Sequence, residues 1–107
     1  MNTYIVKYIN QSDIKLDSDI WNNVPKAEIN NNCGSNYSYL PNTKACIIHN
    51  DKGIMIKFET DELPYVKYYN HNDQVNRDSC VEFFFYPDYE NDKRYFNFEI
   101  NAAGILS

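Results

Sequence analysis

Basic residues and long apolar runs are scarce in this sequence of 107 residues. Ten Lys and Arg stand against fifteen Asp and Glu, which gives a net charge of −5. This balance argues against nucleic acid, whose phosphates require clustered cations, and against an anionic membrane surface. No run approaches the roughly 20 apolar residues of a membrane span. The composition therefore favours a neutral ligand.

The N-terminal residues lack the basic and then apolar pattern of a signal peptide. We therefore leave localisation open between the cytoplasm and export with a leader that was removed. Cysteine is also sparse: Cys33, Cys46 and Cys80 are odd in number, and their spacings match no metal motif. We expect Cys46 and Cys80 to be buried free thiols, because both lie within apolar runs.

Tyrosine, by contrast, is abundant, with ten residues. It favours strands, and it offers a flat apolar face with a polar tip, which suits sugars. Strand-like segments are expected at 3–9, 26–29, 45–49, 54–60, 80–86 and 94–101. One helical turn, capped by Ser18 or Asp19, is expected within 12–23, and loops are expected at 30–43 and 61–78. The pattern predicts a single domain of the all-β class, an antiparallel, jelly-roll-like β-sandwich.

The last two strand segments form the most informative hairpin. Its apolar positions are expected to share one face: Val81, Phe83, Phe85, Phe96, Phe98 and Ile100. Its other face would then carry carboxylates, amides and rings: Glu82, Phe84, Tyr86, Tyr95, Asn97, Glu99 and Asn101. Carboxylates accept hydrogen bonds, amides donate and accept them, and rings pack on the C–H face of a sugar. This polar face therefore predicts a carbohydrate site.

Two stretches of this hairpin resemble carbohydrate-binding module family 9. They are the segment 78–85, Asp-Ser-Cys-Val-Glu-Phe-Phe-Phe, and the segment 95–104, which begins Tyr-Phe-Asn-Phe-Glu. The resemblance implies a β-sandwich that binds sugars without catalysis, often beside a glycoside hydrolase. It also implies that the residue at the position of Glu82 bonds sugar hydroxyls.

The sequence departs from that family at three points. Asn76 stands where the xylanase-attached members have a Trp, and Glu99 stands where they have an Arg. Tyr68, Tyr69 or His71 would have to supply the missing ring. The resemblance also covers only about the first half of the family domain. We therefore expect a truncated sandwich that self-associates as a homo-oligomer.

The ligand-binding candidates are accordingly Glu82, Glu99, Asn101, Asn97, Tyr95, Arg77, Tyr69 and His71. The main alternative is a structural or self-associating domain whose sugar site is degenerate. In that alternative the carboxylates would pair with Arg77, Lys93 or Arg94 on a solvated surface.

Two further alternatives carry less weight. Glu82 and Glu99 have the residue types of a glycosidase pair, but their spacing is not specific, and no catalytic residue is expected. No cofactor is expected either. Calcium stays an alternative for Asp73, Asp78 or the segment 90–92, although no calcium-loop signature is present and these positions suit turns. Trp21, the single tryptophan, is read as a core residue.

Overall fold

The computed structural model describes residues 3–31 and 38–107, so Cys33 and part of the expected loop 30–43 lie outside the described residues. All regular structure in these ranges is strand apart from two short 3-10 turns, which confirms the all-β class. The strands form two separate sheets, as a β-sandwich requires. The chain divides into two compact units, residues 1–62 and 63–107, with one sheet in each. No helix in the described ranges has the length and apolarity needed to cross a membrane.

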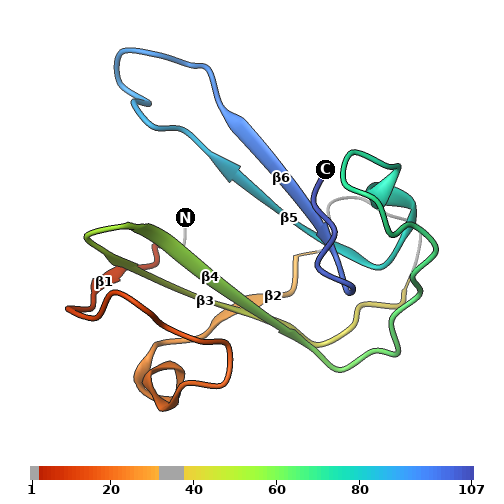
Figure 1. Cartoon of the computed structure of the whole chain (residues 1–107), viewed down its shortest axis with the longest axis horizontal. Helices are drawn as coiled ribbons and strands as arrows, with labels where there is room; N and C mark the ends of the chain where they lie inside the picture. Colours follow the sequence, from red (N-terminus) through yellow and green to blue (C-terminus); the bar gives the residue numbers. More distant parts are fainter. Residues whose placement is uncertain (1–2, 32–37) are drawn as a thin grey trace. The chain divides into compact units, whose positions relative to one another are not determined.

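The sheet of the first unit is built around one long central strand, β3 (Thr43–Asn50). Along one edge it pairs antiparallel with β4 (Gly53–Thr60) over its full length. The opposite edge is shared by β2 (Ala27–Ile29), which is antiparallel, and β1 (Lys7–Tyr8), which is parallel (Figure 1). The parallel pair departs from the expected antiparallel sheet. It is possible because the long connection between β1 and β3 provides the crossover that parallel strands need.

The expected turn between β3 and β4 is confirmed, and the side chain of Asn50 stabilises it through hydrogen bonds to the backbone of the turn. The Asn50 Oδ1 atom accepts hydrogen bonds from the backbone N–H groups of Lys52 and Gly53, at 2.8 and 3.2 Å. Gly53 has a φ angle of 152°, a conformation that residues with a side chain rarely adopt. The turn therefore fixes the register of the β3–β4 hairpin.

The core of the first unit forms around Trp21, which belongs to the 3-10 turn η1 (Asp19–Asn23). Ser18 caps this turn by accepting a hydrogen bond from Ile20 N–H, as expected. Trp21 is 5% exposed, and its indole Nε1 donates to Lys15 O at 2.9 Å. Its buried neighbours in the cluster are Val24, Cys46 and Ile48. The interpretation of Trp21 as a core residue is confirmed.

The sheet of the second unit is a hairpin of β5 (Cys80–Phe85) and β6 (Phe96–Asn101), preceded by the 3-10 turn η2 (Val75–Arg77) (Figure 1). The register confirms the two predicted faces. The apolar residues pair with one another, Val81 with Ile100, Phe83 with Phe98 and Phe85 with Phe96. On the other face, Glu82 lies directly opposite Glu99 and Phe84 opposite Asn97.

A short segment, Ile105–Ser107, lies antiparallel along the outer edge of β6. The backbone N–H and C=O of Glu99 exchange hydrogen bonds with Ser107 at 3.2 and 2.9 Å, and Asn101 N–H donates to Ile105 O. The backbone groups of Glu99 therefore point away from β5. Consequently the Glu82–Glu99 pair occupies a non-hydrogen-bonded position, where opposing Cα atoms lie only about 4.5 Å apart and side chains are closest.

Candidate functional site

The polar face of the β5–β6 hairpin is the principal candidate site. Glu82 is exposed and faces the half-buried Glu99 across the strands. The side-chain amide of Asn97 donates to Glu99 Oε1 at 3.3 Å. In the described ranges, neither carboxylate forms an ion pair: Arg94 pairs with Asp92 instead. The site thus presents two adjacent carboxylates whose acceptor capacity is largely unused by the protein.

Aromatic rings border these carboxylates on the side towards the turn. The Tyr95 ring centroid lies 5.7 Å from that of Phe84 and 5.3 Å from that of Tyr86. Phe84 and Tyr95 are each about half exposed. The structure therefore brings together four of the predicted site residues on one surface, namely Glu82, Glu99, Asn97 and Tyr95.

Asn101 lies at the other end of the same face, where it is almost wholly buried, with 4% exposed. Its Oδ1 atom accepts hydrogen bonds from Ala103 and Ile105 N–H, each at 3.0 Å. Its Nδ2 donates to Tyr68 O at 2.8 Å and to Asp78 Oδ2 at 2.9 Å. Both ends of the amide are therefore occupied by the protein, so Asn101 organises the end of the hairpin.

Asp78, which is 8% exposed, completes this anchor. Its two carboxylate oxygens accept hydrogen bonds from the backbone N–H groups of Lys67 and Tyr68, at 2.9 and 3.0 Å. Burial acts to raise the pKa of Asp78, but the hydrogen bonds from Tyr68, Asn101 and Lys67 outweigh it and lower that pKa below its ordinary value. Asp78 thus holds the loop before η2 against the end of β6.

The remaining predicted residues lie in or next to that loop. Tyr69 follows the anchored Tyr68 and is 65% exposed. The His71 Nδ1 atom accepts a hydrogen bond from Leu106 N–H at 3.0 Å, so this ring supports the C-terminal segment. Arg77 ends η2 and is exposed, as is Asn76. Within the described ranges, no hydrogen bond or ion pair joins Tyr69, His71 or Arg77 to Glu82 or Glu99.

Cys80, the first residue of β5, is only partly buried, and the acidic residues around the site affect its thiol. Its thiol pKa is raised first by burial and then by the carboxylates of Glu82, Glu99 and Asp78. The expectation of free thiols is confirmed for Cys46 and Cys80, although full burial holds only for Cys46. The charges of Glu82 and Glu99 also disfavour any anion beside them.

Of the acidic residues considered for calcium, Asp73 and Asp92 accept hydrogen bonds from nearby backbone groups, Asn70 N–H and Arg94 N–H. Asp78 is engaged by Lys67, Tyr68 and Asn101. Across residues 3–31 and 38–107, no three His, Cys, Asp or Glu side chains gather in a group able to hold a metal ion.

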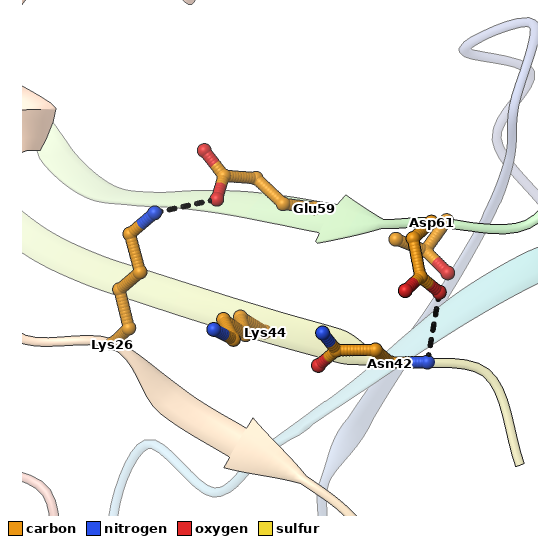
Figure 2. A pocket seen from close by; sticks show the side chains of 6 residues that line it. Lys26, Asn42, Lys44, Glu59 and Asp61 are labelled. Carbon is orange, nitrogen blue, oxygen red and sulfur yellow. Dashed lines mark hydrogen bonds and ion pairs between the residues drawn. The ribbon is translucent and has the colours of Figure 1, made fainter.

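A hollow with a volume of about 220 Å³ lies in the first unit. Figure 2 shows Lys26 reaching across it to Glu59, with Nζ and Oε2 2.8 Å apart, and Asp61 accepting from the backbone N–H of Asn42. Glu59 also pairs with Lys57 at 3.1 Å, and its pKa is lowered by the hydrogen bonds from Lys26 and Lys57. The hollow is small for a ligand pocket, and most of its charges neutralise one another. Its lining in the described part of the chain contains no aromatic ring.

Comparison with known proteins matches this chain to the model of carbohydrate-binding family 9 over residues 11–107. The chain belongs to that family. No curated protein and no solved structure matches it. Membership supports carbohydrate binding as the general function of the chain, and domains of this kind are generally non-catalytic.

The sequence did not predict the structural role of Asp78 and Asn101. A signal was present, because Asn followed by Ala-Ala-Gly at a strand end is typical of a turn in which the Asn side chain bonds the backbone ahead of it. Gly104, with a φ of 78°, completes that turn. The partner Asp78 lies 23 residues away, and only the fold brings the two together.

Proposed function

We propose that the polar face of the β5–β6 hairpin binds a neutral carbohydrate, with Glu82, Glu99 and Asn97 as its hydrogen-bonding groups and Tyr95 as a stacking ring. The observation that carries this proposal is the direct opposition of Glu82 and Glu99 in the register, with no cation paired to either in the described ranges. Like charges directly opposite in a hairpin destabilise it. A surface that keeps such a pair is best explained by a ligand that uses it.

Sugar hydroxyls fit this arrangement chemically. Each glutamate offers two acceptor oxygens, and Asn97 adds an amide that both donates and accepts. Hydrogen bonds to charged groups are stronger than those between neutral groups, so two carboxylates bind one set of hydroxyls firmly. The exposed rings beside them supply the apolar contact that the C–H faces of a sugar need.

The loop anchored by Asp78 lies at the end of the hairpin away from the turn, where Tyr68 O accepts a hydrogen bond from Asn101. The exposed Tyr69 is its best candidate for a second ring, since Asn76 cannot stack and His71 is engaged with Leu106. Arg77 is the loop cation nearest to Asp78 in sequence, and we propose that it contacts the ligand only at the margin of the site. Asn101 contributes by holding this loop in place.

Calorimetric titration with neutral mono- and oligosaccharides tests the proposal, after a glycan array has selected the sugars. We expect Glu82→Gln to weaken binding by about tenfold or more, since it removes a charged acceptor worth about 1.5–3 kcal/mol. Glu90→Gln, in the exposed turn between the strands, is the matched control and should bind as wild type. Binding that survives Glu82→Gln and Glu99→Gln unchanged would rule out this surface.

An accessory role beside a glycoside hydrolase is a further part of this proposal, and the resemblance to modules of that kind supports it.

A second candidate function is self-association. Phe96, Phe98 and Ile100 on the apolar face of the hairpin are 37–58% exposed, and a two-stranded hairpin has no second layer of its own to cover them.

A further inference from the structure

The outer edge of β5 carries backbone groups that have no partner within residues 3–31 and 38–107. Because Glu82 and Glu99 form a non-hydrogen-bonded pair, the backbone N–H and C=O of Glu82 point away from β6. These directions alternate along a strand, so the same groups of Cys80 and Phe84 also point to the outer edge. β5 therefore presents a row of free donors and acceptors, which we call the open edge.

The sequence of β5 contains little that protects such an edge. Edge strands of soluble proteins commonly carry Lys, Pro or a bulge, each of which discourages pairing with another chain. β5 has the sequence Cys-Val-Glu-Phe-Phe-Phe, and its register with β6 is unbroken. Glu82 is its single charged residue. The charge of Glu82 therefore determines which strand can pair with the open edge, and in which register.

A second copy of β5 supplies a complementary strand. Two copies related by a two-fold axis perpendicular to the sheet run antiparallel, and their apolar faces lie on the same side. Two registers are centred on the strand, with either Glu82 or Phe83 on the axis. The first places Glu82 opposite its own copy, which is destabilising because the charges are alike. The second places Glu82 opposite Phe84 of the partner subunit, so it avoids this repulsion.

The register with Phe83 on the axis also continues the apolar face from one copy to the next. Val81 lies opposite Phe85 of the partner subunit, and the two Phe83 side chains lie opposite each other. Aromatic pairs and pairs of an aromatic with a β-branched residue are favourable across strands. The joined sheet contains β5 and β6 of both copies. A lone two-stranded hairpin is marginally stable, whereas a wider sheet with an apolar face is not.

We propose that the open edge of β5 pairs antiparallel with β5 of a second copy of this chain, with Phe83 on the two-fold axis. Phe84 of the partner subunit thereby joins the polar face beside Glu82, on the side away from Glu99. Opposing Cα atoms of such a hydrogen-bonded pair lie about 5.5 Å apart. The partner thus supplies a ring that this chain lacks at Asn76. The role of that ring rests on the proposed carbohydrate site, whereas the strand pairing does not.

The proposed pairing has one electrostatic cost. The Glu82 residues of the two copies occupy diagonal positions, which lie about 7–8 Å apart. Their repulsion in water corresponds to about a twofold change in an equilibrium constant. We therefore expect Glu82→Gln to lower the dissociation constant of the dimer by about twofold in sedimentation equilibrium, and salt to have the same effect on the wild-type protein. Glu90→Gln, in the turn of the hairpin, is the control and should leave the dissociation constant unchanged.

Disulfide trapping tests the register. The background is Cys33→Ser and Cys80→Ser, which keeps the buried Cys46. The variants Val81→Cys and Phe85→Cys are oxidised separately and as a mixture. In the proposed dimer these positions oppose each other with Cα atoms about 4.5 Å apart, within the range that a disulfide spans. We expect a covalent dimer from the mixture and none from either variant alone, because identical positions lie about 13 Å apart along the strands.

The control mixture combines Phe85→Cys with Ile100→Cys, a residue of the same apolar face that lies opposite Val81 in β6. It should yield no covalent dimer, because β5 separates the two positions. Hydrogen exchange of the wild-type protein gives a test without cysteine variants. The amides of Glu82 and Phe84 should exchange quickly in dilute protein and slowly at concentrations where the dimer predominates.

Calorimetry with a neutral monosaccharide tests the partner's ring. The cross-linked dimer should bind about two- to tenfold more tightly than the reduced mixture at a concentration where that mixture is monomeric, since it gains one aromatic contact. No covalent dimer from the mixture, or exchange rates of the β5 amides that are independent of concentration, would overturn the inference. If Glu82→Gln still weakens sugar binding in that case, the carbohydrate site itself stands. A cross-linked dimer that binds no sugar would instead refute the carbohydrate site and leave the strand pairing intact.

Discussion

Removing one charge from the Glu82–Glu99 pair should make the protein more stable while it weakens sugar binding. The two residues are opposed at a non-hydrogen-bonded position, where Cβ atoms lie about 5 Å apart. If the carboxylates spread to about 7 Å in water, their repulsion is about 0.6 kcal/mol. This value falls within the range of about 0.2–1 kcal/mol for cross-strand pairs. We therefore expect Glu82→Gln to raise the free energy of unfolding by about 0.5 kcal/mol.

Urea unfolding followed by circular dichroism measures this change. With a denaturant slope of about 1–3 kcal/mol per molar urea, the midpoint should rise by about 0.2–0.5 M. The gain should disappear in 1 M salt, where the screening length is about 3 Å. Glu90→Gln, which has no strand partner, should leave the midpoint unchanged. A Glu82→Gln protein that unfolds at lower urea than wild type, or a gain that persists in salt, would refute the reasoning.

Four further expectations concern the buried pair Asp78 and Asn101, the negative charge of the two glutamates, and the apolar face of the β5–β6 hairpin. Because the pKa of Asp78 is lowered in the fold, its stabilising effect is complete above its ordinary pKa of about 3.9 and is lost as pH falls through the folded value. Asp78→Asn should therefore be less stable than wild type at neutral pH in urea unfolding, and the difference should shrink in acid. Asn101→Ala should cost about 1–3 kcal/mol in the same assay, because it leaves buried partners unpaired, whereas Asn97→Ala on the exposed face should cost little. Fragments that contain uronic acid rings should bind more weakly in calorimetry than neutral fragments of equal length, with a difference that narrows in salt. Sedimentation should show concentration-dependent self-association that Phe98→Ser reduces, and a wild-type protein that stays monomeric at every concentration would contradict this.

The hairpin was the part of the fold that the sequence predicted best. Strict alternation of Phe83 and Phe85 with Glu82 and Phe84 leaves one register that keeps charges off the apolar face, and the structure has that register. The β3–β4 hairpin could be predicted equally well, because its turn carries the Asn and Gly that its geometry requires. Short-range patterns of this kind need no knowledge of distant contacts.

Features that depend on distant contacts were not predicted. The strand expected over 3–9 is ordered as a strand only at Lys7–Tyr8, where β3 offers free backbone groups for pairing. Asn101 has the residue type of a sugar ligand, and only its burial against Asp78 and Tyr68 shows that its amide is already occupied. In the same way, the ring of Tyr89 in the turn lies against the ring of Tyr86, and alternation along a strand does not place a turn residue on either face.

The short segment Ile105–Ser107 makes the two halves of the site unequal in rigidity. Glu99 belongs to a strand bonded on both edges, by β5 and by this segment, whereas Glu82 belongs to a strand whose other edge has no partner in the described ranges. Amide hydrogens of β5 that point to this open edge should exchange quickly with solvent, and those of Glu99 and Asn101 slowly. A ligand that contacts both Glu82 and Glu99 would hold β5 more firmly against β6. Hydrogen exchange should therefore detect its binding mainly as slower exchange of the backbone amides of β5.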